Sequence, residues 1–209
     1  MPSSTFFHLP EEKRSKLLRC AREEFARAAY PDASINRIIQ AAGIPRGSFY
    51  MYFEDKGELF YYLLSEYGHR LVGHMEQALA RHGGDLLPAF LDFFDAVVLD
   101  YRTTGGEEYE ALGKTMRLNP GLRPGAFLRE DMHALLRDLT AQIDRARLDL
   151  RRDGDLEAML QVLVGVAGHY IKLGILSDDP ERVRAEFTRT LDILARGMAM
   201  GPKAAVSHT

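Results

Sequence analysis

The chain has 209 residues, of which 27% are charged and 46% are hydrophobic, and its formal net charge is −3. This balance is that of an ordinary globular protein with enough apolar material for a core, and the negative net charge argues against a general polyanion binder. The single cysteine, Cys20, excludes an internal disulfide and a cysteine zinc cluster. It fits a reducing cytoplasm, which is the predicted location.

The N-terminal quarter of the chain predicts three helices. Apolar residues at steps of three and four predict the first over residues 10–29. Ser34 suits the N-cap of a second helix over 34–42, and Gly43 can supply the left-handed conformation that ends it. The third helix is short, over 45–52, and is crowded with hydroxyls and aromatics. A helix, a tight glycine turn and a short second helix predict a helix-turn-helix, and hence a DNA-binding segment.

The remainder of the chain also has the apolar periodicity of helices, and no strand alternation is seen. Six further helices are expected between glycine and proline breaks, over 55–82, 85–101, 107–117, from after Gly125 to about 152, 155–176 and 179–197. The most apolar stretch, 158–175, contains Gln161, His169 and Lys172, so we expect a buried helix there and not a membrane span. The sequence therefore predicts an all-α protein of about nine helices, with no membrane partner.

Side chains suited to DNA lie at the start of the short third helix. Arg46 can reach a guanine edge or a phosphate, and Pro45 beside it offers an apolar contact. Gly47 has no side chain, so the helix can approach a phosphate or a groove wall closely. Met51 on this helix and Arg37 on the preceding one are further candidates, although each is as readily an ordinary surface residue.

Hydroxyl groups and helix starts provide candidate phosphate contacts. Ser48, Tyr50 and Tyr52 offer hydroxyls that fix the register on DNA more than they read sequence, and the ring of Tyr52 is equally suited to partial burial. Lys56 lies in the first turn of the fourth helix, where its ammonium and the backbone N–H groups can hold one phosphate. Ser34 can do the same at the start of the second helix.

The run from Ala42 to Leu59, AGIPRGSFYMYFEDKGEL, resembles the signature of the tetracycline-repressor (TetR) family, and the resemblance covers residues 10–60. It implies a homodimer whose recognition helices enter successive major grooves of a near-palindromic operator, and an effector that shifts the distance between them. The implied organisation is a DNA-binding domain over 1–54 and an effector-binding and dimerisation domain over 55–200. The composition of the tail over 201–209 predicts disorder.

The resemblance also implies two sites in the C-terminal part. An effector cavity is expected among aromatic, methionine and histidine side chains, each of which is otherwise ordinary core or surface: Phe90, Phe93, Phe94, Tyr101, Tyr109, Met116, Phe127, Met132 and His169. The last two long helices are expected to form the dimer interface, with burial inside one subunit as the alternative, through Leu160, Leu163, Val164, Ala167, Ile171, Phe187, Leu191 and Leu194. The effector is expected to be a mostly apolar small molecule.

Catalytic and metal motifs are not found in the sequence. It contains no Gly-rich phosphate loop, nucleophile elbow or His-Glu-x-x-His, and the histidines have no metal-ligand spacing. We therefore expect neither an enzyme nor a bound metal or cofactor. The predicted function is that of a transcriptional repressor that a bound ligand releases from DNA. The choice between a repressor and an activator is left open, because it depends on where the operator lies relative to a promoter. The alternative is a helical small-molecule-binding or interaction protein that binds no operator.

Overall fold

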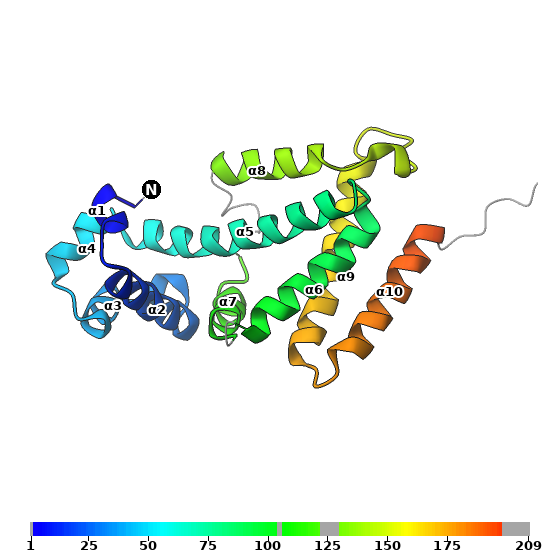
Figure 1. Ribbon diagram of the computed structural model, residues 1–209. Helices are drawn as coiled ribbons and strands as arrows, with labels where there is room; N and C mark the ends of the chain where they lie inside the picture. The colour runs from blue at the N-terminus through cyan, green and yellow to red at the C-terminus, as the bar shows by residue number, and fades with distance from the viewer. Residues whose placement is uncertain (1, 104–105, 122–129, 198–209) are drawn as a thin grey trace, which may run out of the picture. The chain divides into compact units, whose positions relative to one another are not determined.

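The computed structural model describes residues 2–103, 106–121 and 130–197, with the backbone alone at 130–135. Within these ranges the chain is helical and contains no strand (Figure 1), which confirms the predicted all-α class. The same ranges hold ten α-helices where about nine were expected. The additional one is α1 (Ser4–Phe7), which is too short for its apolar spacing to predict.

The other helices follow the predicted order. The N-terminal part contains α2 (Glu11–Arg27), α3 (Ile35–Ala42), α4 (Arg46–Tyr52) and α5 (Lys56–Arg81), with a short 3₁₀ turn at Tyr30–Asp32 between α2 and α3. The C-terminal part contains α6 (Leu86–Thr103), α7 (Glu107–Leu118), α8 (Glu130–Ala141), α9 (Asp155–Leu176) and α10 (Pro180–Arg196), with a 3₁₀ turn at Arg145–Arg147.

The ends of the N-terminal helices are set by local side chains. The Ser34 hydroxyl accepts a hydrogen bond from the Arg37 amide, and Gly43 has a φ of 72°, so both predicted caps of α3 are confirmed. The predicted start of α5 is also confirmed, because the Asp55 carboxylate accepts from the Glu58 amide at 2.8 Å. The Glu58 carboxylate in turn accepts from the Glu54 amide at 2.6 Å, so the first turn of α5 is also tied to the residue before its cap.

The predicted helix running to about residue 152 is wrong, because α8 ends at Ala141. Asp144 caps the 3₁₀ turn that follows, and its own amide donates to the Gly84 carbonyl at 3.0 Å. A Cβ atom at Gly84 would lie 2.5 Å from the Gln142 carbonyl oxygen, so this close approach needs a glycine. A contact between segments so far apart in the sequence overrides the helical periodicity of the chain after Ala141.

The chain divides into two compact units, which are residues 1–73 with 100–141 and residues 74–99 with 142–209. The predicted boundary between residues 54 and 55 lies inside the first unit. One apolar cluster crosses it, since Phe49 and Phe53 before the boundary and Leu59 and Phe60 after it are all buried in the same core.

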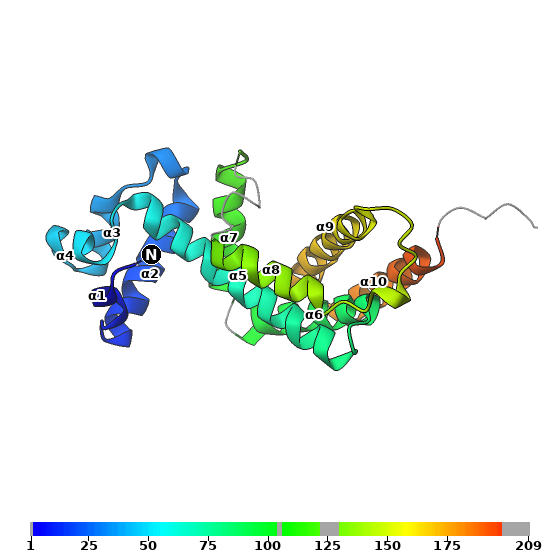
Figure 2. The same cartoon turned by 90° about the horizontal axis from the view of Figure 1, so that it is seen from above.

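Helices α9 and α10 pack against each other in the second unit (Figure 2). Phe187 of α10 is fully buried, and its ring stacks on Tyr170 with centroids 5.1 Å apart. The Phe187 ring also lies 5.6 Å from that of Phe94 in α6. These aromatic contacts join α6, α9 and α10 within the unit.

The expectation that α9 is a buried helix is wrong for the single chain. By length and composition it is the one helix in the described ranges that is apolar enough to cross a membrane, yet only 17% of that apolar window is buried. Leu163, Ala167 and Gly174 are buried on one face of α9, whereas Val162 and Leu176 on the opposite face are exposed. The packing of one chain therefore uses only part of the apolar surface of α9.

Gly174 allows a close approach between α9 and α6. A Cβ atom there would lie 2.9 Å from the Phe94 ring and 3.0 Å from a methyl of Val98. We expect Gly174→Ala to lower the free energy of unfolding by about 1–3 kcal/mol, because Phe94 is itself buried and has little room to move. Chemical denaturation monitored by circular dichroism measures this change.

The matched control is Gly113→Ala in the interior of α7. The nearest atom to a Cβ there is the Arg117 guanidinium, at 3.7 Å, so the methyl group has space. Alanine should stabilise this helix by up to about 1 kcal/mol, because it removes the conformational freedom of glycine. Equal effects at the two glycines would contradict the packing argument for Gly174.

Candidate nucleic-acid interface

Helix α4 has one buried and one exposed face. Phe49 is fully buried, and Phe53, directly after the helix, is 1% exposed. The opposite side presents Tyr50 and Met51, whose exposed fractions are 50% and 58%. Pro45 caps the start of the helix, and Arg46 is its first residue. A short helix that exposes an aromatic ring and a methionine beside an arginine has the character of a binding surface.

Most of the predicted DNA-contacting residues of α4 lie on this accessible side. Pro45, Arg46 and Gly47 are exposed, while Ser48 and Tyr52 are half-buried. Nothing lies within 4 Å of the place that a Cβ atom would take at Gly47, so packing inside the chain does not require a glycine there. The space is therefore available to a partner.

The N-terminal segment holds the end of α4, a role that the sequence did not suggest. The Ser3 amide donates to the Tyr52 carbonyl at 2.9 Å, and the Ser3 hydroxyl donates to the Met51 carbonyl at 2.5 Å. Phe6 of α1 is fully buried, with its ring centroid 4.8 Å from that of Phe53. Orphan carbonyls at the end of α4 are thus satisfied from the beginning of the chain.

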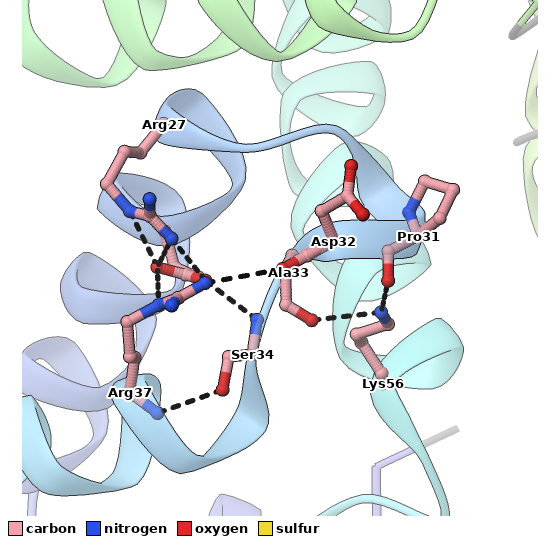
Figure 3. A network of polar contacts seen from close by, with 8 residues as sticks. Arg27, Pro31, Asp32, Ala33, Ser34, Arg37 and Lys56 are labelled. Atoms are coloured by element: carbon pink, nitrogen blue, oxygen red, sulfur yellow. Dashed lines mark hydrogen bonds and ion pairs between the residues drawn. The ribbon is translucent and has the colours of Figure 1, made fainter.

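Lys56, which was predicted to contact a phosphate, and Arg37, for which a DNA contact was left open, both bind groups inside the protein (Figure 3). The Arg37 guanidinium donates to the Glu24 carboxylate at 2.8–3.1 Å. Lys56 Nζ donates to the carbonyls of Pro31 and Ala33 at 3.0 and 2.9 Å. An ammonium group has three N–H donors, so these two bonds do not prevent Lys56 from also binding a phosphate. A phosphate contact by Lys56 therefore stays a prediction.

Glu24 is the residue of this region that sequence reasoning missed. Its side chain is 6% exposed and accepts hydrogen bonds from Arg37, Arg27 and the Ser34 amide. Burial by itself raises the pKa of Glu24, but the hydrogen bonds from Arg37, the Ser34 amide and Arg27 outweigh it and lower the pKa to about 2. In the sequence it is one more glutamate on an amphipathic helix, and nothing in its spacing distinguishes it.

Comparison with known proteins agrees with this geometry. Residues 17–63 match the family model described as bacterial regulatory proteins, tetR family. The chain is 27% identical to a TetR family transcriptional regulator from Chloroflexus aurantiacus, with a TM-score of 0.55, over 94% of this chain and 97% of that one. A TetR-family regulator from Pectobacterium atrosepticum, 21% identical over 92% of this chain and 97% of that one, shares the fold with a TM-score of 0.51.

The DNA-binding segment over residues 17–63 is that of the TetR family. The chain is 26% identical to the HTH-type transcriptional regulator YdgC of Bacillus subtilis, over 86% of this chain and 91% of that protein. The chain is also 37% identical to the HTH-type transcriptional repressor Rv1474c of Mycobacterium tuberculosis, over 34% of this chain and 38% of that protein. This TetR-family protein is a DNA-binding transcriptional regulator, and the proteins it resembles are regulators and not enzymes.

Ion pairs join helices α2, α5 and α7 in the first unit of the TetR-family chain. Arg22 of α2 contacts Glu108 of α7 at 2.6 Å, and Arg70 of α5 contacts the same carboxylate at 2.8 Å. The Tyr67 hydroxyl donates to the Glu108 carbonyl. Tyr109 donates to Asp100 at 2.5 Å, and burial together with this bond raises the pKa of Tyr109. A displacement of α7 would therefore act directly on α2.

The residues predicted for the effector cavity are divided between the two units. In the second unit Phe90 and Phe94 are buried, Phe93 is half-buried and His169 is exposed. In the first unit the half-buried set comprises Tyr101, Tyr109 and Met116, and the rings of Tyr101 and Tyr109 lie 5.9 Å apart. Phe127 and the side chain of Met132 lie outside the described residues. The cavity stays a prediction.

The residues predicted for the dimer interface also differ in exposure. Leu163, Ala167, Phe187 and Leu191 are buried inside the chain, which is the alternative that the sequence left open. Leu160, Ile171 and Leu194 are half-buried, and Val164 is 61% exposed. Exposed apolar side chains absent from the prediction share these two helices with Val164: Val162, Leu173, Leu176 and Ile193. Helical periodicity identified the apolar helices but not which face α10 covers.

Proposed function

We propose that the protein is a cytoplasmic homodimeric repressor that binds a palindromic operator and is released from it by a mostly apolar small molecule. The observation that carries this proposal is the pairing of two exposed surfaces on one chain. Arg46, Tyr50 and Met51 are presented by α4, and the apolar face of α9 is left uncovered in a single copy. A self-complementary face is what a two-fold dimer needs to set two recognition helices one DNA turn apart.

Release by an effector needs a mechanical link between the C-terminal helices and the DNA-binding segment. The Arg22–Glu108–Arg70 ion pairs support such a link, because α7 cannot move without disturbing α2. The small cavity beside them, about 20 Å³ in volume and lined by Phe25, Phe60 and Leu112 among others, has room for about one water molecule. A drug-sized effector would therefore bind elsewhere or widen this cavity.

Selection of genomic DNA fragments on the purified full-length protein tests the proposed function. Bound fragments are sequenced, and one short inverted repeat is expected to be enriched. Enrichment of no sequence by folded, effector-free protein would favour the alternative, a helical small-molecule-binding or interaction protein without operator binding.

Arg46 should contribute strongly to the affinity for the selected fragment. We expect Arg46→Ala to weaken binding by about 10- to 100-fold, since a bidentate base contact or a phosphate contact is lost. The slope of log affinity against log salt distinguishes the two contacts, because it falls by about one only if a phosphate contact is removed. Titration of labelled DNA at several salt concentrations measures both quantities.

Arg19→Ala is the matched control for this substitution. Arg19 lies on α2, is exposed, and pairs with Glu23 on its own helix at 2.8 Å. The variant removes the same charge from the same unit and should change the affinity by less than about twofold. Equal losses at both positions would mean that overall charge, and not the α4 surface, governs binding.

A further inference from the structure

Two charged side chains hold the segment that leads from α2 into the helix-turn-helix (Figure 3). The Glu24 carboxylate accepts a hydrogen bond from the Ser34 amide at 2.7 Å. Lys56 donates to the carbonyls of Pro31 and Ala33, and its Nζ lies 4.8 Å from the centre of the Tyr30 ring. The start of α3 is therefore fixed by charge-assisted hydrogen bonds to groups inside the protein.

We infer that Glu24 is a positioning residue for DNA binding, and that Arg37 acts through Glu24 and not by contacting a DNA phosphate. The inference rests on the proposed operator binding and deepens it. A free amide at a helix start and an arginine in the first turn are usual phosphate ligands. Here both bind one buried carboxylate, which takes the place that a phosphate would otherwise fill.

The geometry of Arg37 favours this role. Its Nε and Nη2 atoms both donate to Glu24, and Nη2 also donates to the Asp32 carbonyl at 3.3 Å. Two edges of the planar guanidinium group are therefore committed to the protein, although the side chain as a whole is 52% exposed. The same carboxylate accepts the Ser34 amide, so the arginine and the first turn of α3 are locked to α2 together.

The position of α3 determines that of α4, because the two helices are joined by a short turn. Gly43 ends α3, and the Ile44 amide then donates to the Ile39 carbonyl at 3.0 Å, so only Ile44 and the cap Pro45 separate the turn from Arg46. A shift of the α3 start would move the exposed side chains of α4. Glu24 touches none of those side chains itself, so its effect on DNA is indirect.

Arg27 provides a matched control on the same carboxylate. It donates to Glu24 at 2.9–3.1 Å, but it belongs to α2, three residues further along the same helix. Its loss leaves the bonds from Glu24 to Arg37 and Ser34 in place. Arg27→Gln therefore removes one ion pair of Glu24 without releasing α3.

The test measures the affinity of the full-length protein for the selected operator fragment as a function of salt. Arg37→Gln, Glu24→Gln, the double variant and Arg27→Gln are compared with the wild type. We expect Arg37→Gln and Glu24→Gln each to weaken binding by about tenfold or more with an unchanged salt slope. The double variant should bind no worse than the weaker single variant, and Arg27→Gln should stay within about twofold of the wild type.

Two results would overturn the inference. A salt slope reduced by about one in Arg37→Gln would show that Arg37 contacts a phosphate, and additive losses in the double variant would show that the two residues act independently. Should Glu24→Gln not fold, Arg37→Gln still decides through its salt slope, because its exposed side chain is not required for the core.

Absence of specific binding by the wild type would instead refute the proposed function. In that case amide hydrogen exchange at Ser34, slowed in the wild type and fast in Glu24→Gln, still tests whether Glu24 holds α3.

Discussion

Val162→Glu is expected to convert the proposed dimer into a folded monomer and to reduce its operator affinity by at least about 100-fold. Val162 lies on the exposed face of α9 with 51% of its side chain accessible in one chain, so a carboxylate there remains solvated in the monomer. In a dimer that buries this face, two unpaired charges would be desolvated. A monomer also loses the gain that comes from linking two half-site contacts, which is about 10²–10⁴ in affinity.

Sedimentation velocity and circular dichroism together measure this effect. The mass should halve while the helical signal is retained. Gln77→Glu is the matched control, because it adds the same charge at an exposed position of the same unit, on α5. If Val162→Glu remains a dimer with full operator affinity, the exposed face of α9 is not the dimer interface.

The second large effect concerns stability in acid. The pKa of Glu24 is about 2 in the folded protein against an ordinary value of 4.5. A lowered carboxylate pKa stabilises the folded state at every pH above the unfolded value, and the stabilisation is lost as the pH falls from 4.5 towards 2. At neutral pH this ionised carboxylate should contribute about 3 kcal/mol, the free energy that corresponds to the difference between the two pKa values.

Urea unfolding of the wild type and of Glu24→Gln over a range of pH isolates this contribution, because other titrating groups are common to both proteins. The difference in unfolding free energy should be constant from pH 7 to about pH 5 and should then shrink by about 1.4 kcal/mol per pH unit. A difference that stays unchanged down to pH 3.5 would contradict the lowered pKa.

Much of the DNA-binding segment could be predicted from the sequence. Ser34 and Gly43 cap α3 as expected, because capping depends on a residue and the backbone within a few residues of it. The exposure of Tyr50 between the buried Phe49 and Phe53 follows equally from helical spacing over seven residues.

The partners of charged residues could not be predicted in this way. Arg37 and Lys56 carry the charge expected of phosphate contacts, yet their nearest acceptors are Glu24 and two carbonyls of the segment before α3. Glu24 and Arg37 lie on different helices, and only the path of the chain through the 3₁₀ turn at Tyr30–Asp32 brings them together. A buried glutamate and a surface glutamate look the same in the sequence.

The sequence by itself determined the helices and the glycine turn of the DNA-binding motif, because these depend on interactions between residues close in the chain. Only the tertiary structure decided which charges face inward, that Ser3 and Phe6 hold the end of α4, and which side of α9 remains open. Each of these depends on contacts between distant segments. Whether a charge or an apolar face is satisfied inside the chain is settled by what packs against it, which helical periodicity does not specify.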